Sequence, residues 1–301
     1  MRAGAFDYMV KPVESSRFIS GVKRAVELIE LRREYSVLSE RMLSDTLTHP
    51  EAFGAIVTNN SRMFSIFKYM ESIAITSKPI LITGETGVGK EMIPKVIHDL
   101  SRKTGEYVTV NVAGLDDNVF SDTLFGHVKG AYTGAEESRA GLIEKASQGT
   151  LFLDEIGDLN PQSQIKLLRL LQEREYFPLG SDMPKISDAR IVVATNRDLN
   201  TLKESGSFRN DLYYRLITHH IHLPPLRDRI EDIPFLVDHF LEKAAASLKK
   251  KKPTVPDELY TYLSTYHFPG NIRELESMVF DAVSYHTSRM LSMDVFKEHI
   301  Q

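Results

Sequence analysis

A glycine-rich loop with one lysine is the first stretch of the sequence that could do chemistry. It reads GETGVGKE over residues 84–91, between an apolar run (79–83) and a stretch with apolar residues at helical spacing (92–100). Glycines let the loop turn its N–H groups toward an anion, and Lys90 would add a positive charge. This order of strand, loop and helix predicts a nucleotide-binding loop. The residues expected to bind the nucleotide are Gly84, Glu85, Thr86, Gly87, Val88, Gly89, Lys90 and Glu91.

Two acidic residues follow a second apolar run, GTLFLDEI (149–156). A buried strand here would deliver Asp154 and Glu155 to its carboxyl end, the edge at which open α/β sheets bind their ligands. Asp154 could hold Mg²⁺, directly or through water, and Glu155 could accept the proton of an attacking water. Together with the glycine loop, this pair predicts ATP and Mg²⁺ as the ligands. Glu91 stands where such loops commonly carry a Ser or Thr that binds the metal.

Polar residues at two further element ends could sense the nucleotide. Asn196 ends a third apolar run, RIVVATN (190–196), where its side chain could orient water or contact the γ-phosphate. Arg273 lies near the start of a helix expected within HFPGNIRELES (267–277), which makes it a candidate second sensor in a helical lid. The presence of the glycine loop and the acidic pair in the same chain supports a sensor role for both residues.

Two arginines stand six residues apart in FRNDLYYRL (208–216), near the end of an expected helix. Arg209 and Arg215 could project from one subunit into the phosphate site of the next, where such an arginine can be worth roughly 10³ to 10⁵ in rate. The two residues therefore suggest an active site shared between subunits.

The composition limits the class of protein. The chain has 301 residues, 42% of them hydrophobic and 26% charged, with a net charge of −4 and no cysteine. Disulfides and thiolate metal sites are thereby excluded, and the net charge gives no sign of a broad basic DNA-binding surface. No apolar run approaches the about 18 residues that span a bilayer. We expect a cytoplasmic protein without a membrane partner.

The order of these motifs resembles that of the central AAA+ ATPase domain of sigma-54-dependent transcriptional activators, the NtrC-like bacterial enhancer-binding proteins. The resemblance covers about residues 54–300. That family also has a glutamate directly after the loop lysine, the position that Glu91 occupies in this chain. The stretches that carry it are GETGVGKE, LFGHVKGAYTGA, GTLFLDEIGDL, ATNRDL, FRNDLYYRL, LPPLRDRIEDI and FPGNIRELE. It implies an α/β fold: an AAA+ P-loop core over residues 48–225, with a parallel sheet sandwiched by helices, and a small all-α lid over residues 226–301.

The same resemblance implies roles for individual residues. Asn111, in the stretch YVTVN, falls where the family places the partner that restrains the catalytic glutamate, here Glu155. The family's arginine fingers, lid sensor and strand-end sensor fall on Arg209, Arg215, Arg273 and Asn196.

The stretch GHVKGAYTGA (126–135) has few aliphatic side chains and is not expected in a core. By the resemblance it is the loop that contacts sigma-54. The family's usual tip is GAFTGA, and Tyr132 takes the aromatic place here; it keeps the flat ring and adds a hydroxyl, so we expect the contact to survive. The expected contact residues are Gly130, Ala131, Tyr132, Thr133, Gly134 and Ala135.

The first residues, AGAFDYMVKPVES (3–15), resemble the last strand and helix of a response-regulator receiver, with Lys11 at the position of its phosphate-sensing lysine. Apolar residues at helical spacing then predict a helix, either solvated or a short coiled-coil dimer linker. We expect residues 1–47 to be a receiver remnant and linker that cannot itself be phosphorylated.

The predicted function is that of a ring ATPase that remodels the sigma-54 RNA polymerase holoenzyme to activate transcription. Its subunits would form a hexamer or heptamer, or an inactive dimer, and DNA would be bound only through a domain absent from this chain. Two alternatives stay open. The first is another AAA+ remodelling ATPase, which would share the nucleotide site but would not require the GAYTGA stretch. The second is a non-hydrolysing nucleotide-binding switch, which would not require Glu155 or the two arginines.

Overall fold

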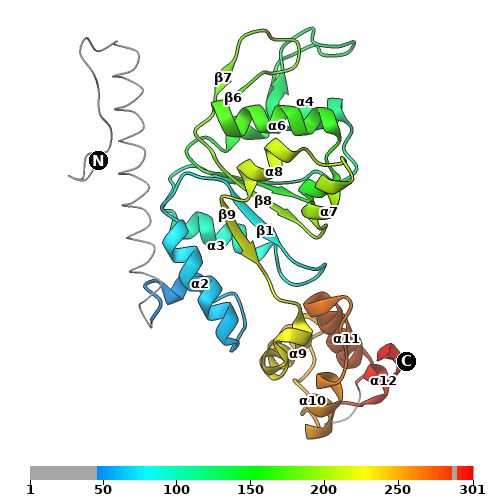
Figure 1. Ribbon diagram of the computed structural model, residues 1–301. Helices are drawn as coiled ribbons and strands as arrows, with labels where there is room; N and C mark the ends of the chain where they lie inside the picture. Colours follow the sequence, from blue (N-terminus) through cyan, green and yellow to red (C-terminus); the bar gives the residue numbers. More distant parts are fainter. Residues whose placement is uncertain (1–45, 287–289, 301) are drawn as a thin grey trace, which may run out of the picture.

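The computed structural model describes residues 46–286 and 290–300 (Figure 1). The predicted receiver remnant and almost all of the linker therefore lie outside the described residues. The helices are α2 (Ser61–Ile73), α3 (Met92–Leu100), α4 (Asp117–Phe125), α5 (Leu142–Lys145), α6 (Pro161–Glu173), α7 (Leu199–Glu204), α8 (Asn210–Leu216), α9 (Ile233–Ser247), α10 (Asp257–Ser264), α11 (Asn271–Tyr285) and α12 (Asp294–Ile300). The strands are β1 (Ile80–Thr83), β2 (Tyr107–Asn111), β3 (Gly126–His127), β4 (Arg139–Ala140), β5 (Thr150–Asp154), β6 (Glu175–Tyr176), β7 (Lys185–Ile186), β8 (Arg190–Thr195) and β9 (His219–His222).

Five strands form a parallel sheet in the order β2-β5-β8-β1-β9. The three central strands, β5, β8 and β1, are buried along almost their whole length because helices cover both faces of the sheet, as is usual for parallel sheets. On β5, Leu151 and Leu153 pack with α4, α6 and α8, whereas Phe152 between them packs with α2 and α3 on the other face. Figure 1 shows these two helical layers on either side of the sheet. The predicted α/β class is confirmed.

The strand order places the predicted chemical residues at one edge of the sheet. The glycine loop leaves the carboxyl end of β1, the acidic pair leaves the end of β5, and Asn196 follows β8, which lies between β5 and β1. Parallel strands bring such ends together, so residues more than 100 positions apart in the chain become neighbours.

Four helices, α9 to α12, form a separate helical lid after β9 (Figure 1). Its core is built from apolar residues of all four helices, including the fully buried Leu241, Leu263, Met278 and Phe296. Amphipathic helices of this length are stabilised mainly by such packing. Within the described part of the chain, no helix is both long enough and apolar enough to cross a bilayer.

Two short hairpins extend from the sheet, away from the lid (Figure 1). Strands β3 and β4 enclose the GAYTGA stretch, and β6 and β7 enclose residues 177–184. The two hairpins meet: the N–H of Val128 donates to the carbonyl of Leu179 at 3.0 Å, and the N–H of Leu179 donates to the carbonyl of Gly126 at 2.8 Å. A side chain at Gly180 would collide with Ala131, so the absence of Cβ permits this close approach.

Candidate functional site

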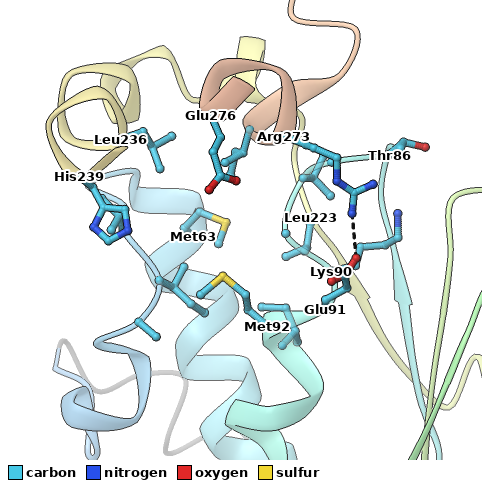
Figure 2. A pocket seen from close by; sticks show the side chains of 18 of the residues that line it. Met63, Thr86, Lys90, Glu91, Met92, Leu223, Leu236, His239, Arg273 and Glu276 are labelled. Carbon is cyan, nitrogen blue, oxygen red and sulfur yellow. Dashed lines mark hydrogen bonds and ion pairs between the residues drawn. The ribbon is translucent and has the colours of Figure 1, made fainter. Parts of the chain in front are cut away.

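A cavity of about 420 Å³ lies where the carboxyl edge of the sheet meets the lid (Figure 2). Most of the predicted nucleotide-site residues line it. They are Thr86, Gly87, Val88, Gly89, Lys90, Glu91, Asn111, Asp154, Glu155 and Arg273. Five others do not line it: Gly84, Glu85, Asn196, Arg209 and Arg215.

The glycine loop has the conformation that its sequence requires. Gly87 and Gly89 have φ angles of 77° and 98°, in the region that other residues rarely adopt. The ammonium of Lys90, only 7% exposed, donates to the carbonyl oxygens of Gly84 at 2.9 Å and Glu85 at 3.0 Å. Burial lowers the pKa of Lys90. A phosphate in the loop would compete with those two carbonyls for the ammonium.

The acidic pair lies at the end of β5. Asp154 accepts a hydrogen bond from the N–H of Glu155 at 2.9 Å, and burial raises the pKa of Asp154. Glu155 has a left-handed backbone, with φ 56° and ψ 44°, which is uncommon outside glycine and often marks functional sites. This conformation turns the chain sharply away from the strand at the residue predicted to be the general base.

Asn196 links the acidic pair to the glycine loop. Its amide Nδ2 donates to Thr86 Oγ1 at 2.9 Å, and its backbone N–H donates to Glu155 Oε2 at 3.4 Å. Asn196 therefore contacts both halves of the predicted phosphate site, one through its side chain and the other through its backbone.

Asn111 lies opposite Asp154 in the register of β2 and β5 and lines the same cavity. Its Oδ1 accepts from the N–H of Ala113 at 2.8 Å. Among the residues that the structure describes, no hydrogen bond joins Asn111 to Glu155. The restraint that the resemblance implies for this pair stays a prediction.

The predicted arginines fall into two groups. Arg273, on α11, reaches the cavity and its Nη2 donates to Glu91 Oε1 at 2.9 Å (Figure 2). Arg209 pairs with Asp211 through two hydrogen bonds of 3.0 and 2.7 Å, and Arg215 donates to the carbonyl of Leu171. Neither of this second pair lines the cavity of its own chain.

The expectation that both arginines lie near the end of a helix was wrong for Arg209. The helix α8 begins at Asn210, so Arg209 precedes the helix and only Arg215 lies in its last turn. The Asp211 carboxylate near the helix N-terminus, where negative charge is favourable, holds the guanidinium of Arg209 beside the helix start.

No motif in the sequence indicates the wall of the cavity that lies opposite the phosphate side. This wall is largely apolar, and its residues come from the segment before α2, from α2, from the end of β9 and from the lid (Figure 2). They include Ala55, Ile56, Val57, Met63, Leu223, Leu236, His239, Phe240 and Ile272. The flat aromatic base of a nucleotide would fit against such a wall, because ligand pockets are largely apolar and carry a few polar groups at specific positions.

The donor set fits Mg²⁺ only together with a nucleotide. Among the described residues, no three His, Cys, Asp or Glu side chains cluster closely enough to hold a metal ion. Mg²⁺ is usually bound by one or two carboxylates plus phosphate oxygens and water, and Asp154 at the cavity wall offers such a carboxylate. The cavity is therefore suited to a Mg²⁺ ion that is bound jointly by Asp154 and by the phosphate oxygens of a nucleotide.

The GAYTGA stretch forms an ordered turn. The N–H of Gly130 donates to the carbonyl of Ala135 at 2.8 Å. The Tyr132 ring packs edge-on against the His127 ring, with centroids 5.1 Å apart, and is still 49% exposed. His127 is fixed by hydrogen bonds to Asp122 and to the carbonyl of Glu137. The tip therefore presents one exposed aromatic ring on a fixed base.

Comparison with known proteins identifies the family. Residues 56–222 match the family described as "Sigma-54 interaction domain", and residues 227–301 match "AAA+ ATPase lid domain". This chain belongs to the sigma-54 interaction domain family. The predicted family resemblance is thereby confirmed for the core and the lid, whereas the receiver resemblance of residues 1–47 stays a prediction.

Two bacterial regulatory proteins are similar to this chain along nearly its whole length. Regulatory protein AtoC of Escherichia coli (strain K12) is 42% identical over 284 residues, which are 94% of this chain and 60% of AtoC. The DNA-binding transcriptional regulator NtrC of Azospirillum brasilense is 38% identical over 298 residues, 99% of this chain and 60% of NtrC. The chain thus spans about 60% of the length of these two relatives.

Solved structures of NtrX from Brucella abortus have the same fold. Its complex with ADP superposes with a TM-score of 0.73 at 30% identity, covering 98% of this chain and 62% of NtrX. Its complex with ATP gives a TM-score of 0.72 with the same identity and coverage. The sigma-54 interaction domain and its lid therefore have the AAA+ fold in this chain.

Proposed function

We propose that this sigma-54 interaction domain hydrolyses ATP with Mg²⁺ and uses the reaction to remodel sigma-54 RNA polymerase holoenzyme. One observation carries the proposal: Lys90, Asp154, Glu155 and Arg273, which come from the sheet edge and the lid, line one cavity. The complexes of NtrX with ADP and ATP support the choice of nucleotide. The setting would be the bacterial cytoplasm, where the polymerase works.

The phosphate side of the cavity would bind and orient ATP. The amides of the glycine loop and Lys90 would hold the phosphates, and the ammonium would leave the carbonyls of Gly84 and Glu85 to do so. Asp154 would hold Mg²⁺, which when bound supplies neutralising charge to the phosphate oxygens. The apolar wall would cover the base.

Glu155 would act as the general base. It would accept a proton from the water whose oxygen attacks the γ-phosphorus, as the bond to the ADP oxygen breaks. Asn196 already contacts both Thr86 and Glu155 and would keep the loop and the base in register. Asn111 lines the same cavity and would restrain Glu155 in another nucleotide state.

The site needs a neighbouring subunit. Arg209 and Arg215 lie off the cavity of their own chain, so they would serve the cavity of the next chain in a ring, where they would stabilise charge on the transferred phosphoryl group. Rings form when the same head-to-tail interface repeats and closes. A hexamer or heptamer would have this arrangement, and a dimer would leave at least one site without its arginines.

A short path joins the nucleotide site to the GAYTGA stretch. Strand β2 ends at Asn111 in the cavity, and the next helix, α4, ends at Phe125 directly before β3. A change at Asn111 can therefore reach Tyr132 through a single helix. The exposed Tyr132 ring, with Gly130, Ala131, Thr133, Gly134 and Ala135, would contact sigma-54.

Steady-state turnover tests the proposed function. ATP hydrolysis should require Mg²⁺, and its rate per chain should rise with protein concentration, because the shared site forms only on assembly. A nucleotide switch would bind ATP without turnover at every concentration, and that result would overturn the proposal. Turnover that is fast and independent of concentration down to a dilution at which the chain is monomeric would refute the shared site.

A further inference from the structure

We infer that Arg227, through Glu85 and Asn271, is a positioning residue that joins the nucleotide-binding loop to the lid and so sets nucleotide affinity. This inference rests on the proposed function, since it concerns the same cavity. None of the three side chains lines the cavity. Their effect would pass through the backbone of the loop, at residues 85–87.

The first contact is an ion pair across the base of the lid. Arg227 lies in the short turn of residues 226–228 that follows β9 and leads into the lid. Its Nη1 and Nη2 donate to the two carboxylate oxygens of Glu85 at 2.8 and 2.5 Å, a paired geometry that fixes direction as well as distance. The Arg227 hydrogen bonds and charge lower the pKa of Glu85 to about 2. The Glu85 side chain thus points toward Arg227 and Asn271 and does not line the cavity.

The second contact is a buried amide. Asn271 begins α11 and is fully buried, with a left-handed φ of 53°. Its Nδ2 donates to Glu85 Oε2 at 3.1 Å and to the carbonyl of Thr86 at 3.0 Å, and its Oδ1 accepts from the N–H of Leu226 at 2.8 Å. The side chain therefore ties the loop, the connecting turn and α11 together at one point. Asn is among the few residues that tolerate this backbone conformation.

The third contact is between backbones. The carbonyl of Gly87 accepts from the N–H groups of Ile272 and Arg273 at 3.0 and 3.3 Å. A Cβ at Gly87 would lie 2.2 Å from the carbonyl oxygen of Gly270. The loop thus satisfies N–H groups at the start of α11 that have no partner within the helix.

These contacts make the loop conformation depend on the lid position. A loop that is held in its binding shape loses less conformational entropy when phosphate binds, so its affinity is higher. Release of the lid would allow the loop to relax and would weaken binding. The chemical step depends instead on Glu155, Asp154 and the neighbouring arginines, so it should be affected less.

A double-mutant cycle on the full chain tests the inference. The probe is a fluorescent ADP analogue with Mg²⁺, and the variants are Arg227→Ala, Glu85→Ala and the double variant. Each single change should raise Kd by about three- to tenfold, and the double variant should be no worse than either single, because residues that act as one unit are not additive. For Arg227→Ala, turnover at saturating ATP should stay within about twofold, so KM changes and kcat does not. Arg227→Lys, which keeps the charge but loses the paired geometry, should lie between the unsubstituted chain and Arg227→Ala.

The control is Arg169→Ala, which removes an exposed arginine that pairs with Glu173 on α6 and does not line the cavity. It should leave Kd unchanged, and thermal unfolding of every variant shows that the lid is still folded. Unchanged affinity in Arg227→Ala and Glu85→Ala, or effects that add in the double variant, would overturn the inference. If the unsubstituted chain does not bind the probe at all, the proposed function fails instead.

Discussion

Arg273 Nη2 lies 2.9 Å from Glu91 Oε1, so an ion pair joins the lid helix α11 to the residue that precedes α3. Both side chains are about two-thirds exposed, at 65% and 67%, and exposed pairs contribute little to stability. The Arg273–Glu91 pair can therefore break with little loss of free energy when a phosphate group binds Arg273 in its place. In this chain Arg273, the predicted lid sensor, is paired with the carboxylate of the residue that follows the loop lysine.

Replacement of Arg273 tests its role toward phosphate. Arg273→Ala should slow ATP turnover at saturation by about 10- to 100-fold, because a preorganised positive charge is lost from the phosphate site. The measurement is steady-state turnover with varied ATP. A variant with unchanged kcat and KM would mean that Arg273 only pairs with Glu91.

Glu155→Gln separates binding from chemistry. The amide has nearly the same shape but cannot accept a proton, so turnover should fall by about 10²- to 10⁴-fold. Affinity for the fluorescent ADP analogue should stay within about twofold, because Glu155 is not needed to hold the phosphates. Retained turnover would remove Glu155 from the role of general base.

Mixing two inactive variants tests the shared site. Arg209→Ala and Glu155→Gln chains should each be nearly inactive alone. In an equal mixture, about one interface in four would pair an intact Glu155 with an intact Arg209 from its neighbour, so about a quarter of the activity should return if the ring is built from repeated head-to-tail contacts. No recovery, in mixtures shown to co-assemble, would place Arg209 outside the neighbour's site.

His219 predicts a pH dependence of stability. It is buried on β9, where it contacts Tyr69 and Thr76, and burial lowers its pKa to about 4. Below about pH 6.5 the unfolded chain binds a proton that the folded chain does not, so stability falls as the pH drops toward 4. The expected loss between pH 7.5 and pH 5 is about 2 kcal/mol from this residue.

Urea unfolding at the two pH values measures this loss. His219→Gln, which cannot be protonated, should lose less stability over that range than the unsubstituted chain. Equal pH dependence in His219→Gln and the unsubstituted chain would show that His219 is not the titrating group.

The phosphate side of the site could be predicted because each part lies within one short stretch of sequence. The glycines of residues 84–89 require a turn, and the acids Asp154 and Glu155 directly follow an apolar run. Parallel strands then bring these ends together without further information. Asn111 had no such signal and was assigned only by resemblance to the family.

The wall of the cavity opposite the phosphates could not be predicted, for a physical reason. Its residues, among them Met63, Leu236 and Phe240, come from three separate helices, α2, α9 and α11, from the chain before α2 and from the end of β9. On each helix they look like ordinary core positions, since apolar periodicity shows which face is buried and not what it packs against. The contact of Ala131 with Gly180 is equally invisible, because it joins two loops 49 positions apart that carry no shared pattern.

Trapping with a transition-state analogue tests the central claim most directly. The chain would be incubated with sigma-54, Mg²⁺, ADP and aluminium fluoride, and then passed over a size-exclusion column. We predict that sigma-54 co-elutes with the unsubstituted chain and not with Tyr132→Ala, which should retain ATP turnover because Tyr132 is far from the nucleotide cavity. If sigma-54 does not co-elute although the analogue binds, or if it co-elutes equally with Tyr132→Ala, the proposed contact between the GAYTGA stretch and sigma-54 is contradicted.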